Sequence, residues 1–202
     1  MKRKDAVARK VAVAQEVAGR ITRLEQMKDL SRQRALLAEL RRGAGKRPGE
    51  LPQLWGMFLR NLPEEMMGWG AEPSREEWAV YTSLTLYALH QQGAEPGKNS
   101  VNAGGQGLGR AAAKLVADDA DARNRIQRRL NRIALASDLP DMLPHLRALV
   151  ILLKGSGIGL DYPQLAKDLY EYQFYDGMSD VRLRWGRDFY RIEKSEEEPE
   201  ND

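Results

Sequence analysis

The sequence predicts an all-α fold made of two small packed helical bundles joined by a Gly-rich loop. Stretches rich in Ala, Leu, Arg, Glu and Gln recur along the 202 residues, and Gly, Pro, Ser or Asp interrupts them. Apolar and polar residues do not alternate over any long stretch, so no strand is predicted. Residues 92–107 carry five of the eighteen glycines and almost no large apolar side chain, which predicts a long connecting loop.

In the first half, helices are predicted over residues 5–28, 31–42, 52–61 and 75–91. Ser31 is suited to cap the second helix, and Gly43 is suited to end it. Pro52 fits the first position of the third helix, because its fixed backbone angle is already helical. The core face of that helix is predicted to comprise Leu54, Trp55, Phe58 and Leu59.

The fourth helix has the clearest signal at its start. Ser74 and Glu77 form a capping-box pattern, in which each side chain can bond the other residue's backbone N–H. The helix that follows is apolar on nearly all sides, so it is predicted to be central and buried.

In the second half, helices are predicted over residues 109–117, 121–137, 142–154, 163–174 and 181–191. The expected organisation is an N-terminal helical extension (1–30), an N-terminal bundle with the connecting loop (31–107), a C-terminal bundle (108–192) and an acidic disordered tail (193–202).

The charge is distributed unevenly along the chain. The net charge is +3, but residues 193–202 alone contribute −5, which leaves +8 on the rest. The first 47 residues hold fourteen Lys and Arg against five Asp and Glu. Such an excess attracts polyanions, and it also keeps a protein soluble, so it only suggests nucleic acid as a partner.

The sequence offers little for catalysis. There is no cysteine, and the two histidines, His90 and His145, share no motif and are interpreted as surface or capping residues. No metalloprotease, P-loop, serine-hydrolase or dinucleotide motif is present. Asp118, Asp119 and Asp121 could bind a divalent metal, but acids between two helices more often cap the second one. We therefore expect no enzyme, no cofactor and no bound metal.

No membrane association is expected either. The longest apolar run, from Ala148 to Leu153, is far shorter than the roughly 20 residues that cross a bilayer, and no secretory signal is present. The absence of cysteine fits a reducing compartment, so a cytoplasmic protein is expected.

Arginines give the strongest functional signal. In the helix predicted over 121–137, four of them fall within a narrow arc, opposite an apolar stripe of Ile126, Leu130 and Ile133. The four are Arg125, Arg128, Arg129 and Arg132. In the last helix, Val181, Trp185 and Phe189 form a similar stripe, and a second arginine face comprises Arg184, Arg187 and Arg191. Guanidinium groups pair bidentately with phosphate and stack on bases, so these faces indicate nucleic-acid binding.

Aromatic residues are predicted to fill the core rather than to stack on bases. Trp55, Trp78 and Trp185 lie on apolar stripes. Trp69 lies between Gly68 and Gly70, where exposure is conceivable, but packing is preferred for it as well.

Several short stretches, taken in order, resemble the CasB family, the small subunit of the type I-E CRISPR surveillance complex Cascade. The resemblance spans about residues 36–191. It is carried by Leu40-Arg41-Arg42-Gly43, Leu54-Trp55, Phe58-Leu59, the run from Leu84 to Gln91, Gly107-Leu108-Gly109-Arg110-Ala111, Arg128-Arg129-Leu130, His145-Leu146-Arg147-Ala148-Leu149, Leu160-Asp161-Tyr162, Leu165-Ala166 and Trp185-Gly186-Arg187-Asp188-Phe189-Tyr190. The first 30 residues and the acidic tail look like additions to the family core.

The resemblance implies an all-α, non-catalytic protein of two helical bundles. It implies that two copies lie head to tail in the complex, in contact with the backbone and large subunits of Cascade. Family members line the path of the guide RNA–target DNA hybrid and stabilise the displaced non-target strand. Base pairing then reads the sequence, so the protein need only supply positive charge along the backbone.

Carried over by position, the first nucleic-acid-binding candidates are Arg110, Arg128 and Arg129, followed by Arg41, Arg42, Arg147, Arg184 and Arg187. Arg125 and Arg132 rest on helical geometry alone. Arg147 and Arg187 could instead pair with acids between helices. Asp161, Tyr162 and Trp185 are interpreted as residues that maintain the fold.

Two other functions are compatible with the same residues. The arginines could dock acidic proteins, which would make the chain a helical adaptor without nucleic-acid binding of its own. Alternatively, Asp118, Asp119 and Asp121 could serve a metal-dependent nuclease. Salt-dependent DNA binding would argue against the adaptor, and DNA cleavage that requires Mg²⁺ and Asp119 would support the nuclease.

Overall fold

The structure is a computed structural model, and it describes residues 3–116 and 120–196. Within those ranges the chain forms only helices, loops and one isolated β-bridge, between Asn102 and Leu160, which confirms the all-α prediction. The helices are α1 (Arg3–Glu25), α2 (Leu30–Arg42), α3 (Trp55–Phe58), α4 (Arg75–His90), α5 (Leu108–Ala113), α6 (Ala120–Leu135), α7 (Leu139–Gly155), α8 (Tyr162–Tyr172) and α9 (Tyr175–Glu196), with short 3₁₀ helices at Pro52–Leu54 and Glu64–Met66. None of the described helices is long and apolar enough to cross a membrane.

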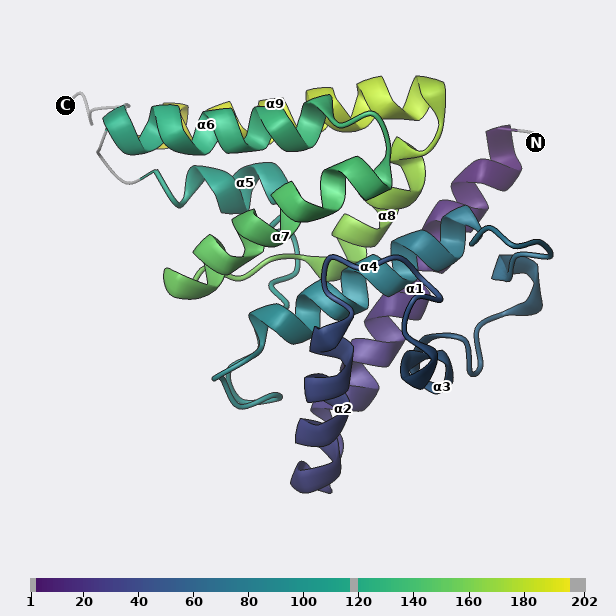
Figure 1. Ribbon diagram of the computed structural model, residues 1–202. Helices are drawn as coiled ribbons and strands as arrows, with labels where there is room; N and C mark the ends of the chain where they lie inside the picture. The colour runs from purple at the N-terminus through teal and green to yellow at the C-terminus, as the bar shows by residue number, and fades with distance from the viewer. Residues whose placement is uncertain (1–2, 117–119, 197–202) are drawn as a thin grey trace.

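Helix α4 lies at the centre of the molecule, as its apolar composition predicts. The predicted capping box is present: the Ser74 hydroxyl accepts from the Glu77 N–H at 2.9 Å, and the Ser74 N–H donates to the Glu77 carboxylate at 2.6 Å. Every residue from Glu76 to His90 is buried. Helices α1, α2, α7 and α8 pack around it (Figure 1).

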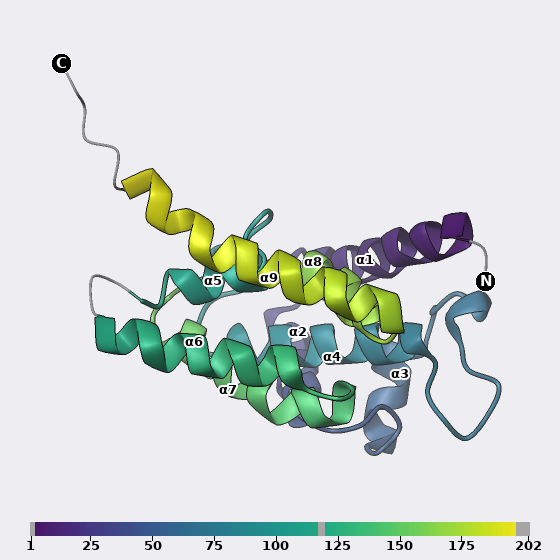
Figure 2. The same cartoon turned by 90° about the horizontal axis from the view of Figure 1, so that it is seen from above.

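Helix α1 contributes to the hydrophobic core of the molecule. Val13, Val17, Ile21 and Leu24 recur every three or four residues and are buried against α8 and α4. Figure 2 shows α1 running beside α8. One apolar cluster joins residues of α1 and α4 to residues of α7, α8 and α9, so the same core serves both halves of the chain. The division into two bundles remains a prediction.

The outer layer is formed by α5, α6 and α9, and α5 approaches the α9 backbone closely at a glycine. Helix α5 packs on α9, and α6 packs on α7 (Figures 1 and 2). At Gly109 of α5, a Cβ atom would lie 2.2 Å from the carbonyl oxygen of Trp185 in α9. Only glycine permits this approach, which explains the glycine inside a six-residue helix.

The loop over residues 92–107 is held by hydrogen bonds rather than left loose. The Gln91 side chain donates to the Asn99 carbonyl at 2.9 Å and accepts from the Val101 N–H at 3.0 Å. The Gly105 N–H donates to the carboxylate of Asp161, which also caps α8. The loop is therefore tied to the segment that precedes α8.

Several local predictions were wrong at element ends. Asp29, not Ser31, caps α2, because its side chain accepts from the Arg32 N–H at 3.0 Å. The third helix shrinks to one 3₁₀ turn and the four-residue α3. Helix α7 begins at Leu139 behind an Asp138 cap, and α9 begins at Tyr175, six residues earlier than predicted. Helix α9 also continues to Glu196, into the segment assigned to the acidic tail, whose residues 197–202 lie outside the described chain.

The burial predicted for the tryptophans was confirmed at Trp78 and Trp185 and wrong at Trp55 and Trp69. Trp78 and Trp185 are buried. Trp55 is 50% exposed, because α3 is too short to bring its whole predicted face onto the core, and Trp69 is 89% exposed in its glycine-flanked loop. His90 was also misjudged: it is buried, and its Nδ1 lies 2.9 Å from the hydroxyl oxygen of Tyr162.

Replacing Gly109 with alanine should destabilise the protein by about 2–3 kcal/mol, because the new methyl group would force α5 away from the α9 backbone. Gly186→Ala is the matched control within α9: nothing lies within 4 Å of the place that a Cβ would take there, so about 0.5–1 kcal/mol of stabilisation is expected. Urea unfolding of both variants measures the difference. Equal stabilities would contradict the close packing of α5 on α9.

His90 should make stability depend on pH. Burial lowers the pKa of His90 to about 4 from its ordinary 6.5. Between these pH values the unfolded chain binds more protons than the folded one. The contribution of neutral His90 to the free energy of unfolding is therefore complete above pH 6.5 and decreases as the pH falls. Between pH 7 and 5 the loss should be about 2 kcal/mol. Urea unfolding of the wild type and His90→Gln over this range should show a shallower pH dependence in the variant, and parallel curves would refute the assignment.

Candidate nucleic-acid interface

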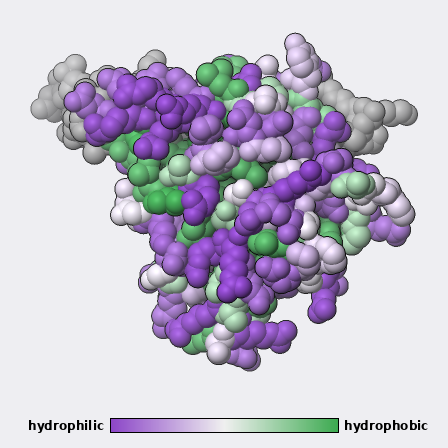
Figure 3. All heavy atoms as spheres, in the orientation of Figure 1, coloured by the Kyte–Doolittle hydropathy of each residue, from purple (hydrophilic) through white to green (hydrophobic). Residues whose placement is uncertain are grey.

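Helix α6 separates an apolar face from a basic one, as predicted. Ile126, Leu130 and Ile133 are 7%, 5% and 0% exposed and pack toward α7. The predicted arginines, Arg125, Arg128, Arg129 and Arg132, are all exposed. Figure 3 shows hydrophilic side chains gathered over α6, with hydrophobic ones beneath them. The α6 arginine face, which comprises these four residues, therefore lies on the outside of the molecule.

Most of this face is not neutralised within the part of the chain that the structure describes. There, Arg128, Arg129 and Arg132 make no hydrogen bond or ion pair, whereas Arg125 does interact with another residue. Several guanidinium groups on one helix face repel one another, and a bound polyanion would relieve that repulsion.

The second predicted arginine face, on α9, has a different role at Arg184. Its guanidinium lies 2.9 Å from carboxylate oxygens of both Asp168 and Glu171 on α8. Asp168 is 1% exposed and also accepts from the indole N–H of Trp185 at 2.6 Å. Burial raises the pKa of Asp168, although Arg184 and the hydrogen bonds to Trp185 and Gln164 act to lower it. Arg184 therefore joins α9 to α8 in addition to lying on the predicted arginine face.

Arg110 and Arg187 lie near acidic residues. The Arg110 Nε is 3.6 Å from a carboxylate oxygen of Asp188, and this arginine is about half exposed. Arg187 is exposed and has no ion pair among the described residues. Arg110 and Arg187 line a cavity of about 560 Å³ together with Arg184 and Arg191. The same cavity is lined by five acidic residues: Asp161, Asp168, Glu171, Asp180 and Asp188. Such a mixed surface attracts a polyanion less strongly than α6 does.

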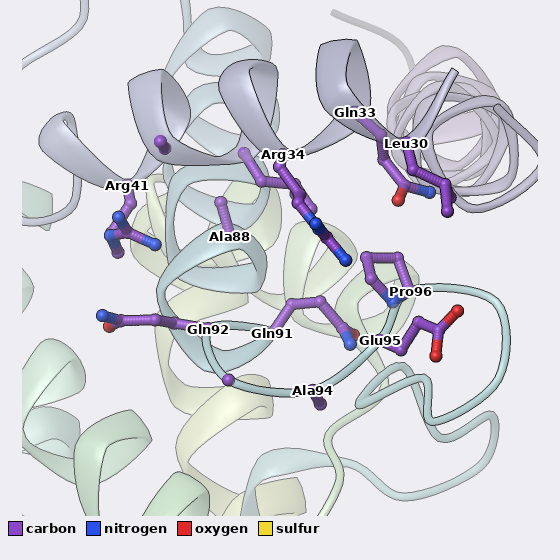
Figure 4. Close-up of a pocket in the computed structure, with 13 residues that line it drawn as sticks. Leu30, Gln33, Arg34, Arg41, Ala88, Gln91, Gln92, Ala94, Glu95 and Pro96 are labelled. Atoms are coloured by element: carbon purple, nitrogen blue, oxygen red, sulfur yellow. The ribbon is translucent and has the colours of Figure 1, made fainter. Parts of the chain in front are cut away.

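The remaining candidates, Arg41, Arg42 and Arg147, lie around the C-terminal end of α2. Arg41 lines a cavity of about 440 Å³, and Figure 4 shows Arg34 and Arg41 extending from α2 toward the loop that contains Gln92. The aliphatic stem of Arg147, on α7, packs over Gly45. Arg147 has no ion pair within the described ranges, so the structure does not show the pairing with an acid that we considered for it.

The three aspartates considered as metal ligands are described only in part. Asp118 and Asp119 lie outside the described residues, and Asp121 lies in the first turn of α6. Among the residues that are described, no group of three or more His, Asp or Glu could hold a metal ion. Asp161 caps α8, and Tyr162 and Trp185 are buried in the core, in agreement with their interpretation as residues that maintain the fold.

Comparison with known proteins shows the same fold elsewhere. CasB from Thermobifida fusca has a TM-score of 0.68 at 29% identity, and the match covers 90% of this chain and 97% of that chain. CasB from Thermus thermophilus has a TM-score of 0.65 at 23% identity, covering 88% and 97%. A chain of a "CRISPR RNA-guided surveillance complex" has a TM-score of 0.68 at 21% identity, covering 92% and 96%. No curated protein sequence matches this chain.

These features define an all-helical protein with the fold of CasB. The family model described as "CRISPR-associated protein Cse2" matches residues 36–190, from α2 into α9. The chain belongs to this family. The match to the Thermobifida fusca structure covers 90% of this chain, which is more than the range 36–190. The structural similarity therefore extends beyond the residues that the family model matches.

Loss of the Arg184 side chain should weaken the fold rather than a binding surface. Arg184→Ala leaves Asp168 buried without its guanidinium partner, so we expect about 2–3 kcal/mol of destabilisation at pH 7. Arg128→Ala, at an exposed position, should change stability by less than about 0.5 kcal/mol. Urea unfolding compares the two variants, and an Arg184→Ala protein as stable as wild type would contradict the structural role.

Proposed function

We propose that this chain is the non-catalytic small subunit of a type I-E CRISPR Cascade complex and that it holds nucleic acid on the α6 arginine face. Membership of the Cse2 family supports the assignment to the complex. Similarity in fold to a chain of an RNA-guided surveillance complex is consistent with it. The single observation that supports nucleic-acid binding is the row of exposed arginines on α6.

The physical chemistry of this face suits a phosphate backbone. Arg128, Arg129 and Arg132 present planar donors that match phosphate oxygens, on a chain whose charge is +8 outside the acidic segment 193–202. No base-reading motif is needed, because pairing between guide RNA and target DNA supplies the sequence specificity. The protein therefore contributes charge and position.

In the proposed complex, the subunit stabilises the guide RNA–target DNA hybrid and the displaced non-target strand in the R-loop. A second copy lying head to tail would extend the arginine surface along the same path. Other Cascade subunits would supply neighbouring contacts, so the isolated chain should bind weakly and the assembled complex tightly. This antiviral role is a cytoplasmic one.

The remaining candidate arginines contribute in different degrees. Arg41, Arg42 and Arg147 form a secondary basic surface around the end of α2. Arg110 and Arg187 lie beside Asp188 and contribute less. Arg184 acts mainly through the structural pair with Asp168.

One observation favours the adaptor as a second candidate function. Trp69 is 89% exposed, and its loop follows Glu64 and Glu65 on the 3₁₀ helix. The Ser74 hydroxyl donates to the Met66 carbonyl at 2.5 Å, which closes the base of this loop. An exposed tryptophan in a loop that follows two acidic residues suits a protein partner better than a nucleic acid.

Reversing two charges on α6 tests the proposal. Arg128→Glu combined with Arg129→Glu should weaken binding of a fluorescein-labelled dT20 oligonucleotide at least tenfold in low salt, because phosphate contacts are replaced by repulsion. Fluorescence anisotropy measures the affinity, and the helical circular dichroism spectrum should be unchanged, since both side chains are exposed.

The control is Lys98→Glu combined with Lys167→Glu, which makes the same change in net charge on the loop 92–107 and on α8. Its affinity should stay within about threefold of wild type, because the effect of distant charges is screened over the Debye length. Equal losses in both double variants would show a general charge effect and would remove α6 as the specific surface.

A further inference from the structure

A further basic site uses none of the arginines proposed above to bind nucleic acid. A cleft of about 280 Å³ opens between α1, α2 and the segment 56–61. Four arginines line it: Arg20, Arg23, Arg32 and Arg60. None of the described residues that line it is acidic. We refer to it as the Arg20 cleft.

Arg20 organises this cleft from within the core. It is 7% exposed, and its Nε donates to the carboxylate of Glu16 at 2.6 Å. Its two terminal nitrogens donate to the carbonyl oxygens of Met57 and Arg60, at 2.6 and 3.1 Å. These bonds fix the backbone that carries Arg60, and Glu16 offsets only one of the four positive charges.

The other three arginines are not neutralised by the chain as far as the structure describes it. The side chains of Arg23, Arg32 and Arg60 are exposed, and they have no hydrogen-bond or ion-pair partner within residues 3–116 and 120–196. Cations drawn together without counter-charges repel one another, so a cleft built in this way favours an anionic occupant. Guanidinium forks match phosphate oxygens in particular.

The floor of the cleft identifies the occupant further. It consists of Leu24, Leu40 and Leu84, which are 9%, 3% and 1% exposed, together with Met27 and Met57. An apolar floor beneath an arginine rim suits a phosphate attached to a sugar and a base, whereas a row of carboxylates would gain little from it. The volume is also large enough for more than a phosphate group alone.

We infer that the Arg20 cleft binds a backbone phosphate of single-stranded nucleic acid, with the adjoining sugar or base on the apolar floor. This inference rests on the proposed function for the class of ligand, but on separate residues. Residues Gly56 and Met57 of α3 line the cleft. Helices α3 and α6 lie apart in both views (Figures 1 and 2), so the chain would hold nucleic acid at two places. The inference also gives the arginine-rich N-terminal third a role.

The test uses the full-length chain and labelled dT20. Arg32→Gln combined with Arg60→Gln should weaken binding about three- to tenfold at 50 mM salt. The slope of log affinity against log salt should become shallower by about 0.7, since the loss of one single-strand phosphate contact changes it by about that amount. The matched control, Lys98→Gln with Lys167→Gln, removes two positive charges without touching the cleft and should stay within twofold of wild type. Both double variants should keep the wild-type unfolding midpoint.

A cross-linking experiment locates the contact independently. Oligonucleotide dT20 that carries 5-iodouracil should, on irradiation, cross-link to peptides that contain Met27 or Met57, because both side chains line the cleft. Cross-links confined to other parts of the chain would overturn the inference.

Competition experiments separate the alternative ligands. In one outcome, pyrophosphate binds the wild type but not the Arg32/Arg60 variant, while both proteins bind dT20 with the same affinity. The cleft would then be a site for free phosphate, and the inference would be overturned. If binding of a deca-glutamate peptide required Arg32 and Arg60 while binding of dT20 did not, the cleft would be a protein-docking site. That result would also overturn the inference.

The α6 variant is measured beside the cleft variant. If dT20 binding falls only in the Arg128/Arg129 variant, the cleft inference fails and the proposed function stands. If binding falls only in the Arg32/Arg60 variant, the cleft inference stands and the proposed role of α6 fails.

Discussion

The rest of the fold depends on the burial of α4 from all sides. A helix that has no solvent face must be surrounded, and here α1, α2, α7 and α8 surround it. Its polar side chains then connect these layers: the Tyr87 hydroxyl donates to Glu25 of α1, and His90 meets Tyr162 of α8. Because the space around α4 is taken by these four helices, α6 and α9 pack in an outer layer and bury only one stripe each.

That outer position explains how similar sequence patterns acquire different roles. Helices α6 and α9 both carry arginines opposite an apolar stripe. On α9, however, Arg184 lies against the buried Asp168 and becomes part of the framework. On α6, no acid of the described chain forms an ion pair with Arg128, Arg129 or Arg132. The difference comes from α8, whose Asp168 and Glu171 pair with Arg184 of α9.

Features that depend on neighbouring residues could be predicted from the sequence. The capping box of Ser74 and Glu77, the buried α4 and the two-faced α6 all follow from local spacing. The exposure of Trp55 and Trp69 and the burial of His90 could not, because these depend on which distant element covers each side chain. The start of α9 was missed since the first turns, from Tyr175, carry few apolar residues.

The same limit applies to the candidate site. Helical spacing predicted the α6 arginine face, but the Arg184–Asp168 pair and the Arg20 cleft require residues of separate helices to meet. In the cleft, Arg23 and Arg32 are exposed charges on two helices with no distinguishing motif. Only their convergence with the buried Arg20 makes them notable.

Nuclear magnetic resonance of the arginine side chains tests the central claim most directly. The chain, at 22.8 kDa, is small enough for the Nε–Hε signals to be resolved and assigned by mutation. On titration with dT20, the signals of Arg128, Arg129 and Arg132 should shift in proportion to binding, while that of Arg184, held by Asp168 and Glu171, should stay in place. Saturable binding that leaves the three α6 signals unmoved would contradict the account.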